Sequence, residues 1–184
     1  RGHNYHFQFE GGWYNLHPDR VLFGRAVTVR MVPLRPDFQN VVEEGGKAEG
    51  RSGGQNTWVI DQLQEGDVLV VDLFGKIEDG TFIGDNLGTA IHARAKTGLV
   101  VDGGIRDLAR VLELPDFNVF CRGAHPSAIY DVTVAEVNGP IRIGNATVLP
   151  GDIVLGTQEG VTFIPPQLAE EVVTRSEDVR QRDV

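Results

Sequence analysis

The middle of the chain alternates short apolar runs with helix-like segments, and this alternation restricts the possible fold more than any other feature. Residues 66–74 (GDVLVVDLF) form an aliphatic run after a Gly-Asp turn, which is typical of a buried strand. Residues 86–97 carry apolar side chains at helical spacing, and further strand-like runs follow at 99–102 and 118–121. A second helix is predicted near 107–114. Strands that alternate with helices predict an α/β fold with parallel pairing.

The flanking segments add strands of another kind. Residues 24–34 (GRAVTVRMVPL) alternate apolar and polar side chains, which is the period of a half-buried strand. Residues 56–63 (NTWVIDQL) favour a short helix. Between residues 130 and 164, strand-like pieces alternate with the turn signals VNGP, IGNA, LPGD and TQEG, which indicates antiparallel hairpins. The predicted fold class is therefore α/β with a mixed sheet and C-terminal β-hairpins.

We expect residues 1–184 to form one domain, since ~100–200 residues is the usual size of a domain. Residues 1–20 are aromatic and aperiodic, so they are expected to be an N-terminal arm, and its histidines His3, His6 and His17 receive no chemical role. Residues 43–54 (EEGGKAEGRSGG) have the composition of a flexible loop, with an active-site lid as the functional alternative. Residues 166–184 predict a terminal amphipathic helix, whose apolar face contains Leu168, Val172 and Val173.

Composition and charge argue against several classes of protein. The net charge of -9 and the scattered basic residues argue against a nucleic-acid partner. The longest aliphatic run, Val68–Val71, is far shorter than the ~18 apolar residues of a membrane span. The single Cys121 lies in an apolar stretch and is interpreted as a small buried hydrophobe, which fits a reducing, cytoplasmic compartment. Because the chain starts at Arg1 without an apolar signal-peptide core, we expect it to begin inside a longer polypeptide.

Asp85 lies directly before a predicted helix, and the pair Arg106-Asp107 lies just after a predicted strand, where the next predicted helix begins. One interpretation is that both aspartates are ordinary helix caps, which bind the unpaired N–H groups of a first turn. The other uses the same position, because a helix N-terminus attracts small anions and Gly84 lets the backbone approach one closely. A guanidinium and two carboxylates then supply a clamp for an oxo acid and hard oxygen ligands for Mg²⁺. The residues alone leave both interpretations open.

The pattern D-x20-R-D, formed by Asp85, Arg106 and Asp107, resembles that of the class II pyruvate aldolases of the 4-hydroxy-4-methyl-2-oxoglutarate/4-carboxy-4-hydroxy-2-oxoadipate aldolase family. This family lies in the superfamily named for regulator of RNase E activity A. The resemblance covers most of the chain through the ordered motifs GRAVTVR, GDVLVVD, GDNLG, GLVVDGGIRD, VFCRGAHP and LPGDIVLGTQEGVTFIP. It implies a single domain of the swivelling β/β/α type that assembles as a trimer or a dimer of trimers.

The resemblance also implies a role for each matching residue. Asp107 would support a divalent metal, Mg²⁺ or Mn²⁺, Arg106 would bind the oxo acid and stabilise enolate charge, and Asp85 would hold metal-bound water. The substrate carboxylate would bind at the backbone of Gly84, Asn86 and Leu87. The chemistry agrees, since a divalent ion chelated by a pyruvyl group is an electron sink for C–C cleavage, and a fixed guanidinium adds positive charge.

The implied reaction is the cleavage of a 4-hydroxy-2-oxo acid to pyruvate and a second carbonyl product, with oxaloacetate decarboxylation as a further activity. Family enzymes also use an acidic residue from the C-terminal region of a neighbouring subunit, and the candidates here are Glu170, Glu171 and Glu177. His125 in RGAHPS is either a turn residue near the pocket or a surface turn. The N-terminal arm and the insertion-like loop depart from the family pattern, which affects the expected substrate more than the reaction.

Two other functions compete with the aldolase. The first is a non-catalytic, protein-binding regulator of the same superfamily. Such regulators typically lack the aspartate after the arginine, so Asp107 favours the enzyme. A methyltransferase is disfavoured, because Phe74 in VVDLFGK stands where close approach of the cofactor needs a glycine.

Overall fold

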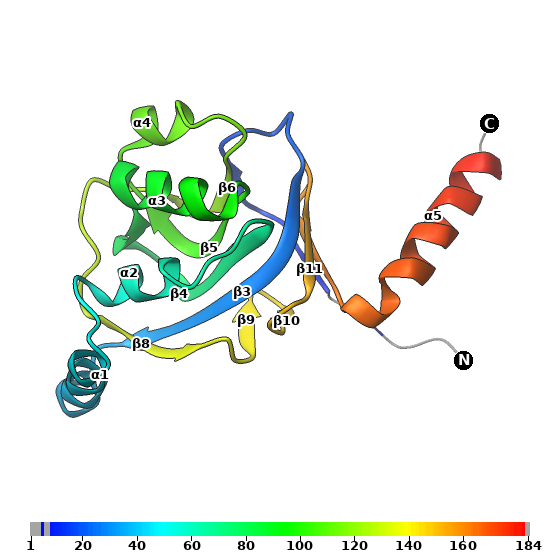
Figure 1. The fold of residues 1–184 in the computed structure, drawn as a ribbon. Helices are drawn as coiled ribbons and strands as arrows, with labels where there is room; N and C mark the ends of the chain where they lie inside the picture. Colours follow the sequence, from blue (N-terminus) through cyan, green and yellow to red (C-terminus); the bar gives the residue numbers. More distant parts are fainter. Residues whose placement is uncertain (1–4, 6–7, 183–184) are drawn as a thin grey trace.

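The computed structural model describes residue 5 and residues 8–182 and has one curled mixed sheet at its centre (Figure 1). The strands of this sheet are β1 (Phe9–Glu10), β2 (Tyr14–Asn15), β3 (Leu22–Pro33), β4 (Asp67–Ile83), β5 (Gly98–Ile105), β6 (Asn118–Cys121), β7 (Gly123–Ala124), β8 (Val132–Val137), β11 (Ile153–Gly156) and β12 (Val161–Ile164). Their order is β1-β12-β11-β3-β4-β5-β6-β2, with β7 beside β5 and β8 beside β3. The predicted mixed-sheet α/β class is confirmed.

Strands β3, β4, β5 and β6 are parallel neighbours, as predicted. Helices α2 (Gln55–Ile60), α3 (Asp85–Ala95) and α4 (Leu108–Leu112) lie on one face of these strands (Figure 1). Alternate side chains of β4 point to opposite faces, so Leu69 and Val71 enter the core under the helices, while Val68 and Val70 enter a second core. The aliphatic run is buried on both faces, which explains why it shows no polar alternation.

The second core lies beneath a separate hairpin of β9 (Ile141–Ile143) and β10 (Ala146–Val148). Strand β8 pairs antiparallel with β3, and β11 and β12 form another hairpin, so the predicted antiparallel character of this region is confirmed. Cys121 lies in the core under the helices, and burial raises the pKa of its thiol to about 12, in agreement with its interpretation as a buried hydrophobe.

The two ends of the chain differ in how they attach to the sheet. In the N-terminal arm, β1 pairs with β12 and β2 pairs with β6, while His3 and His6 lie outside the described residues. After β12, a short 3-10 helix η1 (Pro166–Leu168) leads into helix α5 (Ala169–Arg182), which projects away from the sheet (Figure 1). None of the residues of α5 is buried. No helix among the described residues is long and apolar enough to cross a membrane.

The prediction of a loop over residues 43–54 is wrong for its first half, because helix α1 (Pro36–Ala48) extends through it. Pro36 at the first helical position and Asp37 in the first turn favour the start of this helix. Gly46 is buried against Trp58, and a Cβ at this position would lie 2.3 Å from the indole ring. The glycine that suggested a loop is therefore required for close packing of a helix.

Two predicted boundaries also differ. Strand β4 does not end at Phe74 but bends at Phe74 (φ 45°) and Gly75 (φ 77°) and continues to Ile83. A strand rather than a helix therefore follows VVDLFGK. Helix α3 ends at Ala95, and the next residue, Lys96, adopts the left-handed conformation and donates its N–H to the carbonyl of His92. The predicted end of the helix, Gly98, already belongs to β5.

Candidate functional site

The candidate site lies where two neighbouring parallel strands end. Ile83, the last residue of β4, pairs with Ile105, the last residue of β5, and the N–H of Arg106 donates to the carbonyl of Ile83 at 3.0 Å. The residues that follow each strand therefore lie side by side, although they are far apart in the sequence. Ligands of open α/β sheets bind at such carboxyl ends.

Asp107 does not cap the helix that it precedes. It is the N-cap residue of α4 by position, but its side chain makes no capping hydrogen bond there. Its backbone is left-handed, with φ 57°, a conformation that Asp and Asn adopt more readily than most other residues. The carboxylate points instead to the start of α3, where Oδ2 accepts from the N–H of Asp85 and from Nε of Arg106, both at 3.4 Å.

Gly84 makes this arrangement possible. A Cβ at position 84 would lie 2.2 Å from Oδ2 of Asp107 and 3.0 Å from Nε of Arg106. Any larger residue would have to displace one of these two side chains. Gly84 therefore keeps the Arg106-Asp107 pair close to the first turn of α3.

Asp85 was predicted to be the N-cap, but it is the first residue of α3, and the N-cap is Gly84, one position earlier. Oδ1 of Asp85 accepts the N–H of Asn86 at 2.7 Å, so one of the two amides predicted to receive a substrate carboxylate is occupied by this side chain. The other amide, that of Leu87, has no acceptor among the described residues, while the Leu87 side chain packs against the core. The first turn of α3 thus presents one open backbone donor.

The charged groups of the site are partly exposed and partly unpaired. The side chains of Arg106 and Asp107 are 38% and 41% exposed, and the terminal nitrogens of Arg106 have no partner among the described residues. One carboxylate oxygen of Asp107 and one of Asp85 also have no partner among the described residues. No group of three or more His, Cys, Asp or Glu in the described part of the chain is arranged to hold a metal ion. Two carboxylates with free oxygens still fit Mg²⁺, which often takes only one or two protein ligands.

His125 lies at the same edge of the sheet. Its N–H donates to the carbonyl of Ile105 at 3.0 Å, next to Arg106, and its Nδ1 lies 2.9 Å from Oγ of Ser127. The backbone of His125 is thus close to the strand ends, while its ring is held by Ser127.

The sequence analysis missed an ionic cluster just before the site. Arg122 binds the buried carboxylate of Asp102 through Nε at 2.6 Å and Glu10 through Nη2 at 3.0 Å. The guanidinium also lies 4.0 Å from the centre of the Trp13 ring. This cluster ties the N-terminal arm to β5 four residues before Arg106. No local pattern could reveal it, because its members are far apart in the sequence.

The chain is similar to known proteins over most of its length. A model of the family described as "RraA-like: Aldolase/RraA" matches residues 3–163. A protein of Halalkalibacterium halodurans named "Putative 4-hydroxy-4-methyl-2-oxoglutarate aldolase" is 32% identical over 139 residues, which are 72% of this chain and 63% of that protein. Protein DlpA of Legionella pneumophila is 29% identical over 93% of this chain, but the match is only 26% of its own length. The chain thus spans less than two thirds of these relatives.

Solved structures show the same fold. RraAS2 of Streptomyces coelicolor, titled an unusual member of the RNase ES inhibitor RraA protein family, has a TM-score of 0.79 and 28% identity, over 95% of this chain and 80% of its own. The RNA-processing inhibitor RraA from Thermus thermophilis has a TM-score of 0.63 and 22% identity, over 85% of this chain and 84% of its own, so it shows the fold alone.

Proposed function

Because the chain belongs to the RraA-like family described as Aldolase/RraA, we propose that it is a divalent-metal-dependent class II aldolase that cleaves a 4-hydroxy-2-oxo acid to pyruvate. The observation that carries this proposal is the orientation of Asp107, whose carboxylate turns from α4 towards Arg106 and the first turn of α3. Capping of α4, the helix that follows Asp107, does not explain this orientation. A site for an anionic substrate and a cation would use it.

In this proposal Asp107 would hold Mg²⁺ or Mn²⁺, and Asp85 would hold metal-bound water. The ion would supply a Lewis acid for the 2-oxo group. The fit rests on the two carboxylates, each with one oxygen that has no partner among the described residues. Gly84 supports the site indirectly, since it leaves room for Asp107 and Arg106.

The substrate would bind through its carboxylate and its 2-oxo oxygen. The N–H of Leu87 and the N-terminal end of α3, with Asn86 beside it, receive the carboxylate of the pyruvyl group. The free terminal nitrogens of Arg106 donate to the 2-oxo oxygen, where negative charge develops.

The 4-hydroxyl group loses its proton to a base and becomes a carbonyl as the C3–C4 bond breaks. The electron pair moves to the 2-oxo oxygen, and protonation at C3 gives pyruvate. Oxaloacetate decarboxylation would develop charge on the same oxygen.

The base would come from a neighbouring subunit, with Glu170, Glu171 and Glu177 of α5 as candidates. Helix α5 projects from the sheet (Figure 1). Its side chains Val172, Val173 and Val179 are exposed. Apolar surface of this kind is typical of subunit interfaces and supports an assembly of three or six subunits.

The sheet itself has a second apolar surface that supports this assembly. Phe23 pairs with Leu155, Leu155 with Thr162, and Thr162 with Phe9, so these side chains share one face. Phe9 and Phe23 are 62% and 63% exposed. A second copy of the chain would cover this row and bring its own α5 with it.

A panel of 4-hydroxy-2-oxo acids and oxaloacetate, assayed for pyruvate with Mg²⁺, Mn²⁺ or EDTA, tests the proposed reaction. We expect release that depends on the metal and stops with EDTA. Release that is unaffected by EDTA would contradict the class II mechanism.

A protein-binding regulator is the second candidate, because RraAS2 of Streptomyces coelicolor, which has this fold, is titled an unusual member of the RNase ES inhibitor RraA protein family. It predicts no pyruvate release from any member of the panel. In either case we propose a cytoplasmic location and no nucleic-acid partner, in line with the net charge of -9.

A further inference from the structure

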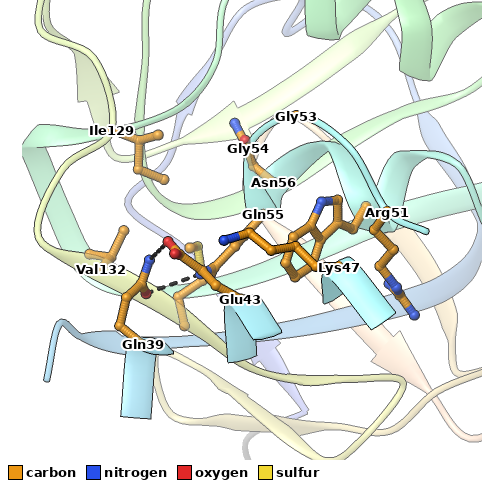
Figure 2. A pocket seen from close by; sticks show the side chains of 12 residues that line it. Gln39, Glu43, Lys47, Arg51, Gly53, Gly54, Gln55, Asn56, Ile129 and Val132 are labelled. Atoms are coloured by element: carbon orange, nitrogen blue, oxygen red, sulfur yellow. Dashed lines mark hydrogen bonds between the residues drawn. The ribbon is translucent and has the colours of Figure 1, made fainter. Parts of the chain in front are cut away.

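A cavity of about 450 Å³ lies between α1, α2 and β8, formed by residues other than those of the strand-end site. We call it the α1–α2 pocket (Figure 2). Its lining residues are Met31, Gln39, Glu43, Lys47, Arg51, Gly53, Gly54, Gln55, Asn56, Trp58, Ile129 and Val132. Its volume lies within the range of ~300–1,000 Å³ that is usual for small-molecule sites. Three of these residues, Gln39, Glu43 and Lys47, lie on α1.

One side of the pocket is apolar. Met31, Ile129 and Val132 supply aliphatic surface, and Trp58 adds an aromatic ring. The ring is held in place, since Gly46 packs directly against it and the guanidinium of Arg51 lies 5.7 Å from its centre. This wall can receive an apolar side chain of a ligand.

The other side holds a carboxylate in a fixed orientation. The backbone N–H of Val134 donates to Oε1 of Gln55 at 2.7 Å, and Nε2 of Gln55 donates to Gln39 at 3.0 Å. Nε2 of Gln39 then donates to Oε1 of Glu43 at 2.5 Å. This relay runs from β8 to the pocket and orients Glu43 (Figure 2). The second oxygen of Glu43 has no partner among the described residues.

Lys47 follows Glu43 by one helical turn. Pairs with this spacing commonly form ion pairs, but these two side chains do not. Figure 2 shows the carboxylate of Glu43 and the ammonium of Lys47 reaching into the same space from α1. The charge of Arg51 is directed elsewhere, to Glu49 at 2.7 Å. The pocket therefore contains one negative and one positive group that are separate, beside an apolar wall.

We infer that the α1–α2 pocket binds a free α-amino acid with an apolar side chain. The ammonium group of the ligand meets Glu43, its carboxylate meets Lys47, and its side chain packs against Met31, Ile129 and Val132. A simple anion would face Glu43 unpaired, and a simple cation would face Lys47 unpaired. A ligand with both charges close together satisfies both groups at once. This inference does not depend on the proposed aldolase reaction.

The chain has two tryptophans, Trp13 and Trp58, and only Trp58 lines the pocket. In protein labelled with 5-fluorotryptophan, two fluorine NMR resonances can be assigned with Trp58→Phe. L-leucine, L-methionine and L-phenylalanine are the probes. We expect at least one of them to shift the Trp58 resonance in a saturable way and to leave that of Trp13 in place.

Analogues of leucine that lack one charge test the recognition of both. We expect 4-methylpentanoate, without the ammonium, and 3-methylbutylamine, without the carboxylate, to bind at least about tenfold more weakly. Glu43→Gln should weaken the binding of leucine by a similar factor. Glu44→Gln is the matched control, because Glu44 is exposed on the next position of α1 and does not line the pocket.

Three results would overturn the inference. The first is that none of the three amino acids shifts the Trp58 resonance. The second is that 4-methylpentanoate or the amine binds as tightly as leucine. The third is that Glu43→Gln and Glu44→Gln weaken binding equally or not at all. Pyruvate release enters none of these readouts, so failure here is distinguishable from failure of the aldolase proposal.

Discussion

The carboxylate of Asp107 accepts the backbone N–H of Asp85 at 3.4 Å, across the ends of two parallel strands. An aspartate at an N-cap position would ordinarily bind its own helix, α4, and this one does not. The contact joins the two halves of the D-x20-R-D pattern into one site.

Gly84→Ala should disrupt the site more than the fold. A methyl group at this position would lie 2.2 Å from Oδ2 of Asp107, so the carboxylate must move. We expect pyruvate release to fall by ~100-fold, since misplaced catalytic groups lose this much. Gly45→Ala is the control, because its Cβ would have no atom within 4 Å. It should keep full activity and gain roughly 0.5–1 kcal/mol of stability.

Arg106→Lys should fold normally and lose activity. The terminal nitrogens of Arg106 are unpaired in the structure, so folding depends little on them. An ammonium cannot reproduce the planar fork of a guanidinium at a substrate oxygen, and the expected loss in kcat is ~10²–10³-fold. Thermal melts and steady-state kinetics check both parts. A variant with parental kcat would remove Arg106 from the proposed chemistry.

Asp72→Asn should stabilise the protein at neutral pH. Burial raises the pKa of Asp72 above its ordinary value of 3.8, while Phe74 and Arg142 amides oppose this shift. A carboxyl whose pKa is higher in the folded state costs stability as the pH rises from 3.8 through that higher value. The parent should therefore approach the stability of Asp72→Asn only in acid. Melting temperatures at several pH values test this, and equal curves at pH 7 would contradict it.

Removal of α5 should change the assembly and leave the sheet folded. Helix α5 has no buried residue in the single chain, so truncation after Leu168 removes no core contact. We expect three or six subunits for the full chain by light scattering and smaller particles for the truncated form. A full chain that stays monomeric at micromolar concentration would contradict the shared-site proposal.

These cases show which features the sequence could predict. The parallel strands were predictable because Val68–Val71 and Leu99–Val101 are aliphatic without alternation, which only burial on both faces allows. Helix α1 was not, since Gly46 looks like a loop residue until Trp58 is placed against it. The sequence was sufficient to single out Asp85 and the pair Arg106-Asp107 as the two parts of the site. The orientation of Asp107 was not, because it depends on the space beside Gly84 across two strands.

The most direct test of the central claim is Asp107→Asn. Asp107 makes no capping hydrogen bond to α4, and asparagine tolerates the same left-handed backbone, so the melting temperature should barely change. Removal of the negative charge deprives a hard cation of its ligand. Pyruvate release and its dependence on Mg²⁺ or Mn²⁺ should be measured together with thermal melts of parent and variant. The account predicts that metal-dependent release falls by orders of magnitude at an unchanged melting temperature. An Asp107→Asn protein that melts like the parent and keeps full metal-dependent release would contradict it and favour the protein-binding regulator.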